Sequence, residues 1–550
     1  MTPPNNDDNK AVQALALPEL VDAIALHLKS QRVIATACLV CKVWREAWTP
    51  LLWRSLGFDR SDGAVPDSIV LQGHHTKNLT YDYPKDEHLD LVLPHCPNLQ
   101  SLNLSCTKAT IEVLAPFLMD LGGRRLRQFE LDTYMIRASD LLPVLVGHCH
   151  RLEQVILSFP YFKERSELSS RTLMRLLEMC PRLRELELTW VEILDDVTEV
   201  VGESEGEEHV VQSRLEILSL DAVTQSDTSF LGLLERCPQL WMLHVGGNPT
   251  LTNASIYRIP ELCPNLDSLT IILQTRDRHA SSTHTFEQLF QKTDWPLKLR
   301  YLCLSGDSVD DRVVAQIASS QAPSLRTLDL RHCREVTDLG VELVLRRCAL
   351  LETLLLFGTA VTNAIMEGPQ ERWKCFETLK ELDIRKIGVT DLGHRYPQDD
   401  PRIKQNREAF TKIRRRVQML PRLQKLAMSF YGIHEELLQG FYYESTQGED
   451  GGGRMLDCEV MNGADAACSS TVATSRESGG NVAVQGSPRL RTLNALGASA
   501  LLGEDMDRFL DNYPYLTRLV MNRPSSSHEM RERLFGAGVS FVAGDSHLWQ

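Results

Sequence analysis

The chain has 550 residues, 43% of them hydrophobic, and its 59 basic and 73 acidic side chains leave a formal charge of −14. An acidic surface repels phosphate backbones, which argues against general nucleic-acid binding. The polar N-terminus lacks the layout of a secretory signal, and no apolar run approaches the roughly 18 residues that span a bilayer. We therefore expect a soluble cytoplasmic or nuclear protein that binds neither nucleic acid nor membrane.

The N-terminal part is predicted to be a disordered tail (residues 1–14) followed by a small helical module (residues 15–58). Pro18 suits a first helical turn, and apolar residues at spacings of three and four continue to Leu28 and again from Val33 to Trp48. A third short apolar piece begins at Leu51. Two or three short helices bury too little surface to be stable alone, so this module needs a neighbour.

The module resembles the F-box motif in Leu17-Pro18-Glu19-Leu20, in Leu39 to Trp44 and in Leu52-Trp53. The resemblance implies docking on the Skp-type adaptor of a cullin-RING ubiquitin ligase. The residues that it implies for the adaptor interface are Leu17, Pro18, Leu20, Ile24, Leu28, Leu39, Val40, Cys41, Trp44 and Trp53. The alternative is an N-terminal cap that only covers the apolar edge of the segment that follows.

A leucine-rich unit, Leu-x-x-Leu-x-Leu, recurs along most of the remaining chain, usually 25 to 28 residues apart. This period indicates stacked repeats, because a unit of this size cannot bury a core alone. Residues 59–95 are predicted to be a linker and cap, and residues 96–545 a solenoid. The anchor leucines are Leu99, Leu126, Leu152, Leu183, Leu215, Leu240, Leu266, Leu299, Leu325, Leu351, Leu379, Leu423, Leu490 and Leu516.

One repeat can be interpreted completely. Leu325 to Leu330 alternates apolar and polar residues, as a half-buried strand does, and Thr337 is placed to cap a helix whose apolar face carries Val341 and Val344. Six cysteines stand three residues before an anchor leucine, which predicts reduced thiols packed in a structural position. They are Cys96, Cys149, Cys180, Cys237, Cys263 and Cys348.

This pattern resembles the cysteine-containing subfamily of leucine-rich-repeat proteins over roughly residues 79–522, most closely from Leu325 to Cys348. The resemblance implies an α/β fold, with a curved parallel sheet inside and helices outside. The position of an F-box-like module before such repeats is itself a known family arrangement.

Three segments interrupt the period, at about residues 189–213, 386–420 and 445–486. The first is acidic, and the last is Gly/Ser-rich and predicted to be disordered. The second contains a basic run from Arg402 to Arg416. That run is either a nuclear localisation signal or an exposed helix face, and each insertion is either a binding loop or a tolerated excursion.

The resemblance also implies that polar positions beside the strand leucines face a concave binding surface. Leu355 and Phe357 are large apolar residues at such positions, and with Arg331 and Arg385 they resemble an anchor patch with a charged rim. The alternative is local packing. The candidate substrate-binding residues are Glu185, Glu187, His244, Asp329, Arg331, Leu355, Phe357, Glu381, Asp383 and Arg385.

Motifs that carry chemistry are lacking in the sequence. It contains no phosphate-binding loop, no nucleophile elbow and no His-Glu-x-x-His. The pair Cys38 and Cys41 supplies too few ligands for zinc, and Cys41 matches a packed position of the F-box. We expect a non-enzymatic protein with no metal and no cofactor.

The leading hypothesis is therefore an adaptor that recruits a protein substrate to a Skp-cullin-F-box ubiquitin ligase, with the repeats binding the substrate. The alternative is a ligase-independent scaffold or inhibitor that binds a protein partner directly.

Overall fold

In a computed structural model of the protein, the described residues are 30–40, 42–58, 65–120, 123–160, 165–195, 212–272, 284–291, 298–367, 373–385, 387, 401–429, 490–496, 509–511, 513–521 and 533–543. The chain divides into two compact units. Unit 1 comprises residues 1–351 and 358–360, and unit 2 comprises residues 352–357 and 361–550.

Parallel strands form the sheet of unit 1, and each repeat contributes one strand. Eleven strands of the described residues form this sheet. Those eleven are β1 (Ser55–Phe58), β2 (Asn78–Asp82), β3 (Ser101–Thr107), β4 (Gln128–Thr133), β5 (Gln154–Ser158), β7 (Glu185–Thr189), β9 (Ile217–Asp221), β10 (Met242–Gly246), β11 (Ser268–Ile272), β12 (Tyr301–Ser305) and β13 (Thr327–Asp329).

The register of these strands stacks one apolar residue of each repeat on the next. Leu186 of β7 pairs with Leu218 of β9, which in turn pairs with Leu243 of β10. All three are fully buried, so the alternation seen in the sequence becomes a continuous ladder of core side chains. The strand leucines therefore stabilise the array through neighbouring repeats rather than within a single repeat.

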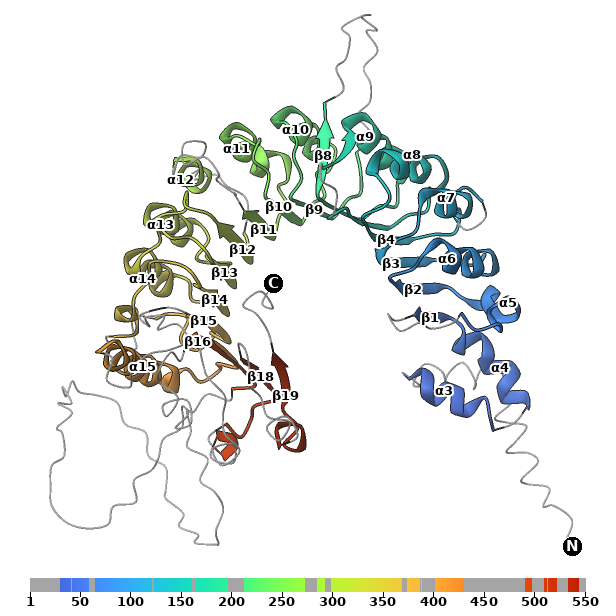
Figure 1. The fold of residues 1–550 in the computed structure, drawn as a ribbon. Helices are drawn as coiled ribbons and strands as arrows, with labels where there is room; N and C mark the ends of the chain where they lie inside the picture. Colours follow the sequence, from blue (N-terminus) through green and yellow to red (C-terminus); the bar gives the residue numbers. More distant parts are fainter. Residues whose placement is uncertain are drawn as a thin grey trace, which may run out of the picture. The chain divides into compact units, whose positions relative to one another are not determined.

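Helices cover one side of the unit 1 sheet, so that the strands form the other side (Figure 1). They are α5 (Ile69–Gln72), η1 (Gly73–His75), α6 (Asp86–Val92), η2 (Leu93–His95), α7 (Ile111–Met119), α8 (Ala138–His148), α9 (Ser170–Met179), α10 (Asp227–Glu235), α11 (Asn253–Leu262), α12 (His284–Gln291), α13 (Asp311–Ser320) and α14 (Asp338–Arg347).

Adjacent helices of unit 1 are joined by a recurring hydrogen-bonded contact at their N-termini. The carboxylate of Asp311, the first residue of α13, accepts hydrogen bonds from the backbone N–H of Thr337 (2.8 Å) and from its hydroxyl (2.5 Å). Asp227 accepts the same two bonds from Thr252, and Asp86 accepts them from Thr110. Because Thr337 and Thr252 also cap their own helices, one carboxylate orders two successive repeats.

The predicted structural role of the six regularly placed cysteines is confirmed. Cys96, Cys149, Cys180, Cys237, Cys263 and Cys348 have no exposed surface, and each is a free thiol. Burial raises the pKa of Cys96 to about 11 and that of Cys180 to about 12. The thiols are therefore protonated at neutral pH and act as small apolar core groups.

Unit 2 continues the same strand pattern with β14 (Thr353–Leu355), β15 (Glu381–Asp383), β16 (Lys425–Ser429), β17 (Thr492–Leu496), β18 (Arg518–Met521) and β19 (Ser540–Ala543). All are parallel, and they pair in chain order from β14 to β19. The 3-10 helix η3 (Asn363–Met366) and the longer α15 (Pro401–Met419) accompany them.

The sheet begins earlier than the sequence predicted. Residues 55–58, expected to end the helical module, form β1 and pair in parallel with β2. The third apolar piece is not a third helix, because Leu51 and Leu52 end α4 (Lys42–Leu52). Residues 65–95, expected to be linker and cap, contain a complete repeat in which buried Thr76 takes the place of the anchor leucine. At the C-terminal end of the predicted solenoid, the last described strand is β19, and Val539, directly before it, is buried.

The structure describes part of the first two predicted insertions and none of the third. A small second sheet pairs β6 (Ser166–Ser169) with β8 (Val191–Leu194), and β8 lies at the start of the acidic insertion. Most of the basic insertion is α15. Residues 196–211 and the Gly/Ser-rich stretch at 445–486 lie outside the described residues, as does the tail at 1–14.

Candidate functional site

The face of the unit 1 sheet opposite the helices, here called the open face, carries the side chains that point away from the core. Along its middle row the register places Asn103, Glu130, Ile156, Glu187, Ser219 and His244 on successive strands β3 to β10. All six are at least partly exposed. This row is therefore accessible to a partner.

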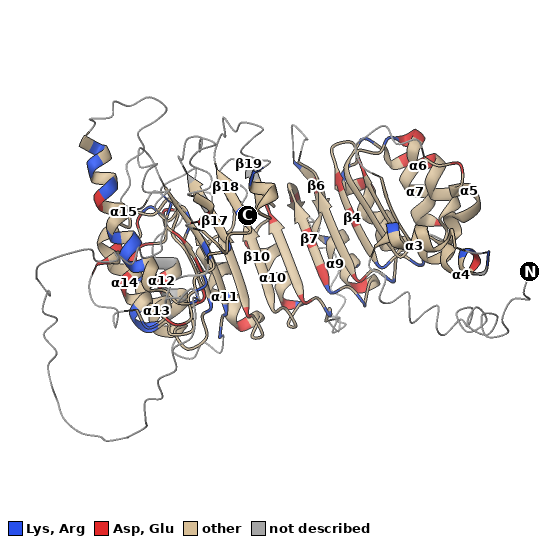
Figure 2. Cartoon of the chain, turned by 90° about the horizontal axis from the view of Figure 1, so that it is seen from below, with Lys and Arg blue, Asp and Glu red and all other residues tan. Residues whose placement is uncertain are grey.

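The open face of unit 1 is acidic. Glu185 and Glu187 lie two residues apart on β7, Glu130 and Asp132 on β4, and Asp221 ends β9, whereas these outward positions of β2 to β10 hold no Lys or Arg. Figure 2 shows the acidic segments on β4 and β7. An acidic sheet face favours a basic partner segment.

The acidic side chains on this face influence one another. Burial raises the pKa of Glu187, the neighbouring carboxylate of Glu185 raises it further, and His244 partly offsets both effects. Burial likewise raises the pKa of Glu130, with Asn103 opposing it through a hydrogen bond. His244 lies 3.8 Å from Asp221 (Nε2 to Oδ1) and lowers the pKa of that carboxyl. The predicted residues Glu185, Glu187 and His244 thus belong to one electrostatic group.

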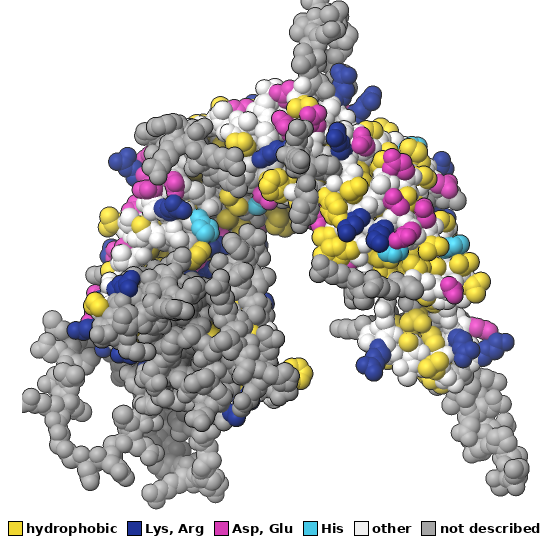
Figure 3. All heavy atoms as spheres, in the orientation of Figure 1, with side chains coloured by type: hydrophobic (Ala, Val, Ile, Leu, Met, Phe, Trp, Pro, Cys, Tyr) yellow, Lys and Arg dark blue, Asp and Glu magenta, His cyan; other side chains and the backbone are white. Residues whose placement is uncertain are grey.

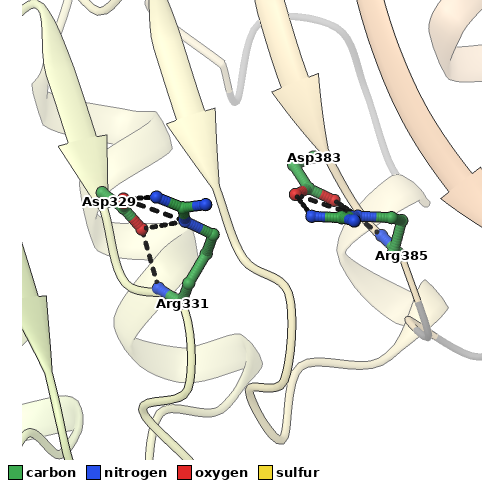
Figure 4. Close-up of polar contacts among 4 residues, drawn as sticks. All are labelled: Asp329, Arg331, Asp383 and Arg385. Carbon is green, nitrogen blue, oxygen red and sulfur yellow. Dashed lines mark hydrogen bonds and ion pairs between the residues drawn. The ribbon is translucent and has the colours of Figure 1, made fainter. Parts of the chain in front are cut away.

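Two of the predicted acidic residues form ion pairs with the arginine two positions later (Figure 4). In unit 1, Asp329 accepts hydrogen bonds from Nε of Arg331 (2.9 Å) and from its Nη2 (2.7 Å). In unit 2, Asp383 accepts them from Nε of Arg385 (2.9 Å) and from its Nη2 (2.6 Å). Asp329 and Asp383 are both buried, so these groups hold the backbone after the strand and do not form an open polar surface.

The prediction of an exposed anchor patch around Leu355 and Phe357 is wrong. Leu355 is buried, with 8% of its surface exposed, and Arg385 is buried too rather than part of a charged rim. Phe357 is half-buried, with the guanidinium of Arg385 lying 4.5 Å from its ring centre. These residues pack locally, which was the alternative interpretation. Glu381, also predicted, pairs with Lys425 at 3.0 Å.

The structure describes only part of the predicted adaptor-binding set. Helices α3 (Gln31–Ala37) and α4 enclose a small core of Ile34, Ala37, Cys38 and Trp48, with Trp44 stacked on Trp48 at 4.9 Å. In contrast, Leu39 and Val40, between the helices, are 76% and 63% exposed. Trp53 is half-buried. Leu17, Pro18, Leu20, Ile24, Leu28 and Cys41 lie outside the described residues.

The basic insertion is an amphipathic helix. In α15, Ile403, Phe410 and Ile413 are buried, while Lys404 and Arg407 are exposed, which agrees with the helix-face interpretation. Figure 2 shows the Lys and Arg segments along this helix. The last arginine of the run is not available to a receptor: Arg416 is 3% exposed and its Nε donates to the carbonyl of Met366 at 3.2 Å.

Sequence reasoning missed Glu130, Asp132 and Asp221 on the open face. The repeat period would have found Glu130, because it occupies the strand position of Glu187 in another repeat, and Asp132 and Asp221 share the outward position two residues later. Among the residues that the structure describes, no group of three or more His, Cys, Asp or Glu side chains is arranged to hold a metal ion. None of the helices in the described ranges is long and apolar enough to cross a membrane.

Comparisons with known proteins agree with this architecture at the level of the repeat. Residues 321–345 match a family model described as Leucine Rich repeat, and they include β13 and most of α14. No curated protein matches the chain at a significant level.

Solved structures similar to this chain include two complexes. The yeast Rad7 and Elc1 complex shares 16% identity over 78% of this chain and 91% of the matched chain, with a TM-score of 0.39. The TLR13–ssRNA13 complex shares 14% identity over 85% of this chain and 51% of the matched chain, with a TM-score of 0.40.

Proposed function

We propose that this chain is a non-enzymatic substrate-recognition subunit that acts in the cytoplasm or the nucleus. Its N-terminal module docks on a Skp-type adaptor of a cullin-RING ubiquitin ligase, and its repeats bind the protein to be modified. It contributes proximity, because holding a substrate beside a ligase raises the effective concentration at the transfer site. No residue of this chain performs the transfer chemistry.

The observation that carries the docking proposal is the exposure of Leu39 and Val40 beside the small core of α3 and α4. Val33, at 47% exposed, lies on α3 close to them in sequence. Figure 3 shows hydrophobic side chains on the surface of this module. Four residues of the described part of this module are buried in its core, which leaves it marginally stable, so covering these side chains with a partner would stabilise it.

The repeats supply the second surface of the proposal. The acidic open face of unit 1 complements a basic segment of a protein partner. Charge complementarity of this kind mainly speeds association and selects among partners, so binding should weaken as salt rises.

The docking proposal is tested by a pull-down of the full chain with a purified Skp-type adaptor. Leu39→Asp/Val40→Asp should reduce adaptor capture by about tenfold or more, because two charges replace apolar surface that would be covered. Leu339→Asp is the matched control, since Leu339 is 70% exposed but lies on α14, far along the chain. Equal capture by both variants, or no capture by the parent chain, would refute adaptor docking.

A ligase-independent scaffold remains the second candidate, and one observation favours it. The middle row of the open face lies on β3 to β10 and includes no residue of α3 or α4. A partner that binds the parent chain and the Leu39→Asp/Val40→Asp variant equally, in the absence of any adaptor capture, would support the scaffold.

A further inference from the structure

A basic cavity of about 560 Å³ lies in unit 1, where α4 meets the starts of the first strands. The described residues that line it include four arginines, one lysine and two histidines, and no acidic side chain. They are Pro50, Leu51, Arg54, His74, His75, Lys77, Asn98, Gln100, Arg125, Arg127 and Arg151.

Three of these seven basic side chains come from a row that the fold itself creates. The residue that directly precedes each strand hydrogen-bonds to its equivalent in the previous repeat. Lys77 N–H donates to the carbonyl of Arg54 (2.9 Å), Gln100 N–H to that of Lys77 (2.7 Å), and Arg127 N–H to that of Gln100 (2.7 Å). Neighbouring strands lie roughly 4.8 Å apart, so these side chains stand close together on one edge of the sheet.

Further along the same row the charges neutralise one another. Arg184 pairs with Glu216 at 3.3 Å, and Asp267 pairs with Arg300 at 3.4 Å. At the cavity end, by contrast, Arg127 is the one member of the row with an acidic partner among the described residues, Glu153 at 3.4 Å. Arg54 and Lys77 form no ion pair with any residue that the structure describes.

A second row adds further positive charge. The residue just before each anchor position is His75, Asn98, Arg125 and Arg151 in successive repeats. Arg125 and Arg151 are exposed and also form no ion pair with a described residue. The side-chain amide of Asn98 donates to the carbonyl of His74 at 2.6 Å, which fixes the turn that brings both histidines to the cavity.

This concentration of cations in a chain of net charge −14 points to an anionic ligand. Like charges held side by side repel one another, and a bound anion removes that repulsion. The volume is in the range of small-molecule sites, and guanidinium groups bind phosphate through two parallel hydrogen bonds. A long nucleic acid fits less well, because its backbone would also meet the acidic surface.

We propose that this cavity binds a compact small molecule that bears two or more phosphate groups. Pro50 and Leu51 supply an apolar wall, and the guanidinium groups of Arg125 and Arg151 act with Arg54 and Lys77 on the phosphates. This site does not depend on adaptor docking.

The test is isothermal titration of the full chain with inorganic tripolyphosphate at physiological salt. We expect saturable binding that Arg125→Gln/Arg151→Gln weakens by at least tenfold, because both removed groups are charged donors. Arg182→Gln/Arg214→Gln is the matched control: both arginines are exposed, both directly precede an anchor leucine, and neither lines the cavity. The control should bind as the parent does.

The proposal would be overturned by the absence of saturable binding, by equal weakening in both double variants, or by sulfate binding equally well at matched ionic strength. Binding of a doubly phosphorylated peptide without binding of tripolyphosphate would also overturn it, and would assign the cavity to a protein segment. Thermal unfolding of each variant shows whether a loss of binding comes from misfolding. Adaptor capture, measured as in the pull-down above, shows whether the docking proposal fails independently of this one.

Discussion

Arg385 and Asp383 form an ion pair in which both partners are buried, with 1% and 0% of their side chains exposed and 2.6 Å between Nη2 and Oδ2. The backbone N–H of Arg385 also donates to the same carboxylate, at 3.1 Å. Asp329 and Arg331 repeat the arrangement in unit 1 with a more exposed arginine. A buried charge left without its partner is costly, so this pair makes the end of β15 sensitive to single changes.

Arg385→Met is expected to destabilise unit 2 by about 3–5 kcal/mol, because it leaves Asp383 buried and unpaired. Lys425→Met is the control, since its ion pair with Glu381 is partly exposed and is worth about 0–1 kcal/mol. Hydrogen exchange of peptides covering β15 measures the stability change in both variants. If Arg385→Met loses no more stability than Lys425→Met, the ion pair of Arg385 has no structural role.

Two glycine substitutions should have opposite effects. A methyl group on Gly340 of α14 would lie 2.5 Å from Oδ1 and 3.2 Å from Cα of Asp311, so Gly340→Ala should cost about 1–3 kcal/mol. Gly147 of α8 has nothing within 4 Å of that position, and Gly147→Ala should stabilise by about 0.5–1 kcal/mol. Urea denaturation compares them, and the same sign for both would be inconsistent with these contacts.

The Asp227 carboxylate should support stability in a defined pH range. Burial raises its pKa, but hydrogen bonds from Ser255 and Thr252 outweigh this and lower it overall. A lowered folded-state pKa gives stability that is present above the unfolded value of about 3.9 and is lost as pH falls through the folded value. Asp227→Asn should therefore flatten the acid side of the stability profile measured by thermal unfolding. An unchanged pH slope would refute this.

Glu187 should behave in the opposite way. Its pKa is raised by burial and then by Glu185, so ionising it opposes folding at neutral pH. Glu187→Gln should raise the melting temperature at pH 7, and the gain should vanish below the unfolded pKa of about 4.3. If the open face binds a basic partner, the same variant should bind it more weakly. A stability gain that persists at pH 3 would point to a cause other than charge.

Thiol labelling should separate the cysteines by position. Burial raises the pKa of Cys149 and Cys237 to about 12, and both thiols are inaccessible. Burial and Asp132 raise the pKa of Cys106 as well, but its thiol, 3.3 Å from Asp132, is partly exposed, so access distinguishes it. Iodoacetamide at pH 7.5 should therefore label Cys106 in the native protein while Cys149 and Cys237 react only after unfolding, as peptide mass spectrometry can show. Native labelling of Cys149 at the rate of Cys106 would contradict the packed position.

Repeat architecture was predictable because its signal is periodic. Anchor leucines, strand alternation and the Thr337 cap each report a local preference that neighbouring repeats reinforce. The prediction failed at the first repeat, where Thr76 replaces leucine, and at β1, where only the pairing with β2 identifies a strand. Short apolar segments such as Leu51 to Phe58 suit helix and strand equally well until a partner strand is present.

The sequence by itself determined which positions face the core, because the apolar period shows directly which side of a strand or helix is buried. Only the tertiary structure decided how charged side chains combine, since that depends on residues from different repeats becoming neighbours. It grouped Glu187 of β7 with His244 of β10 on the open face, and it paired Arg184 with Glu216 of the next repeat. It also gathered Arg54, Lys77, Arg125 and Arg151 around one cavity, although nearly a hundred residues separate the first from the last.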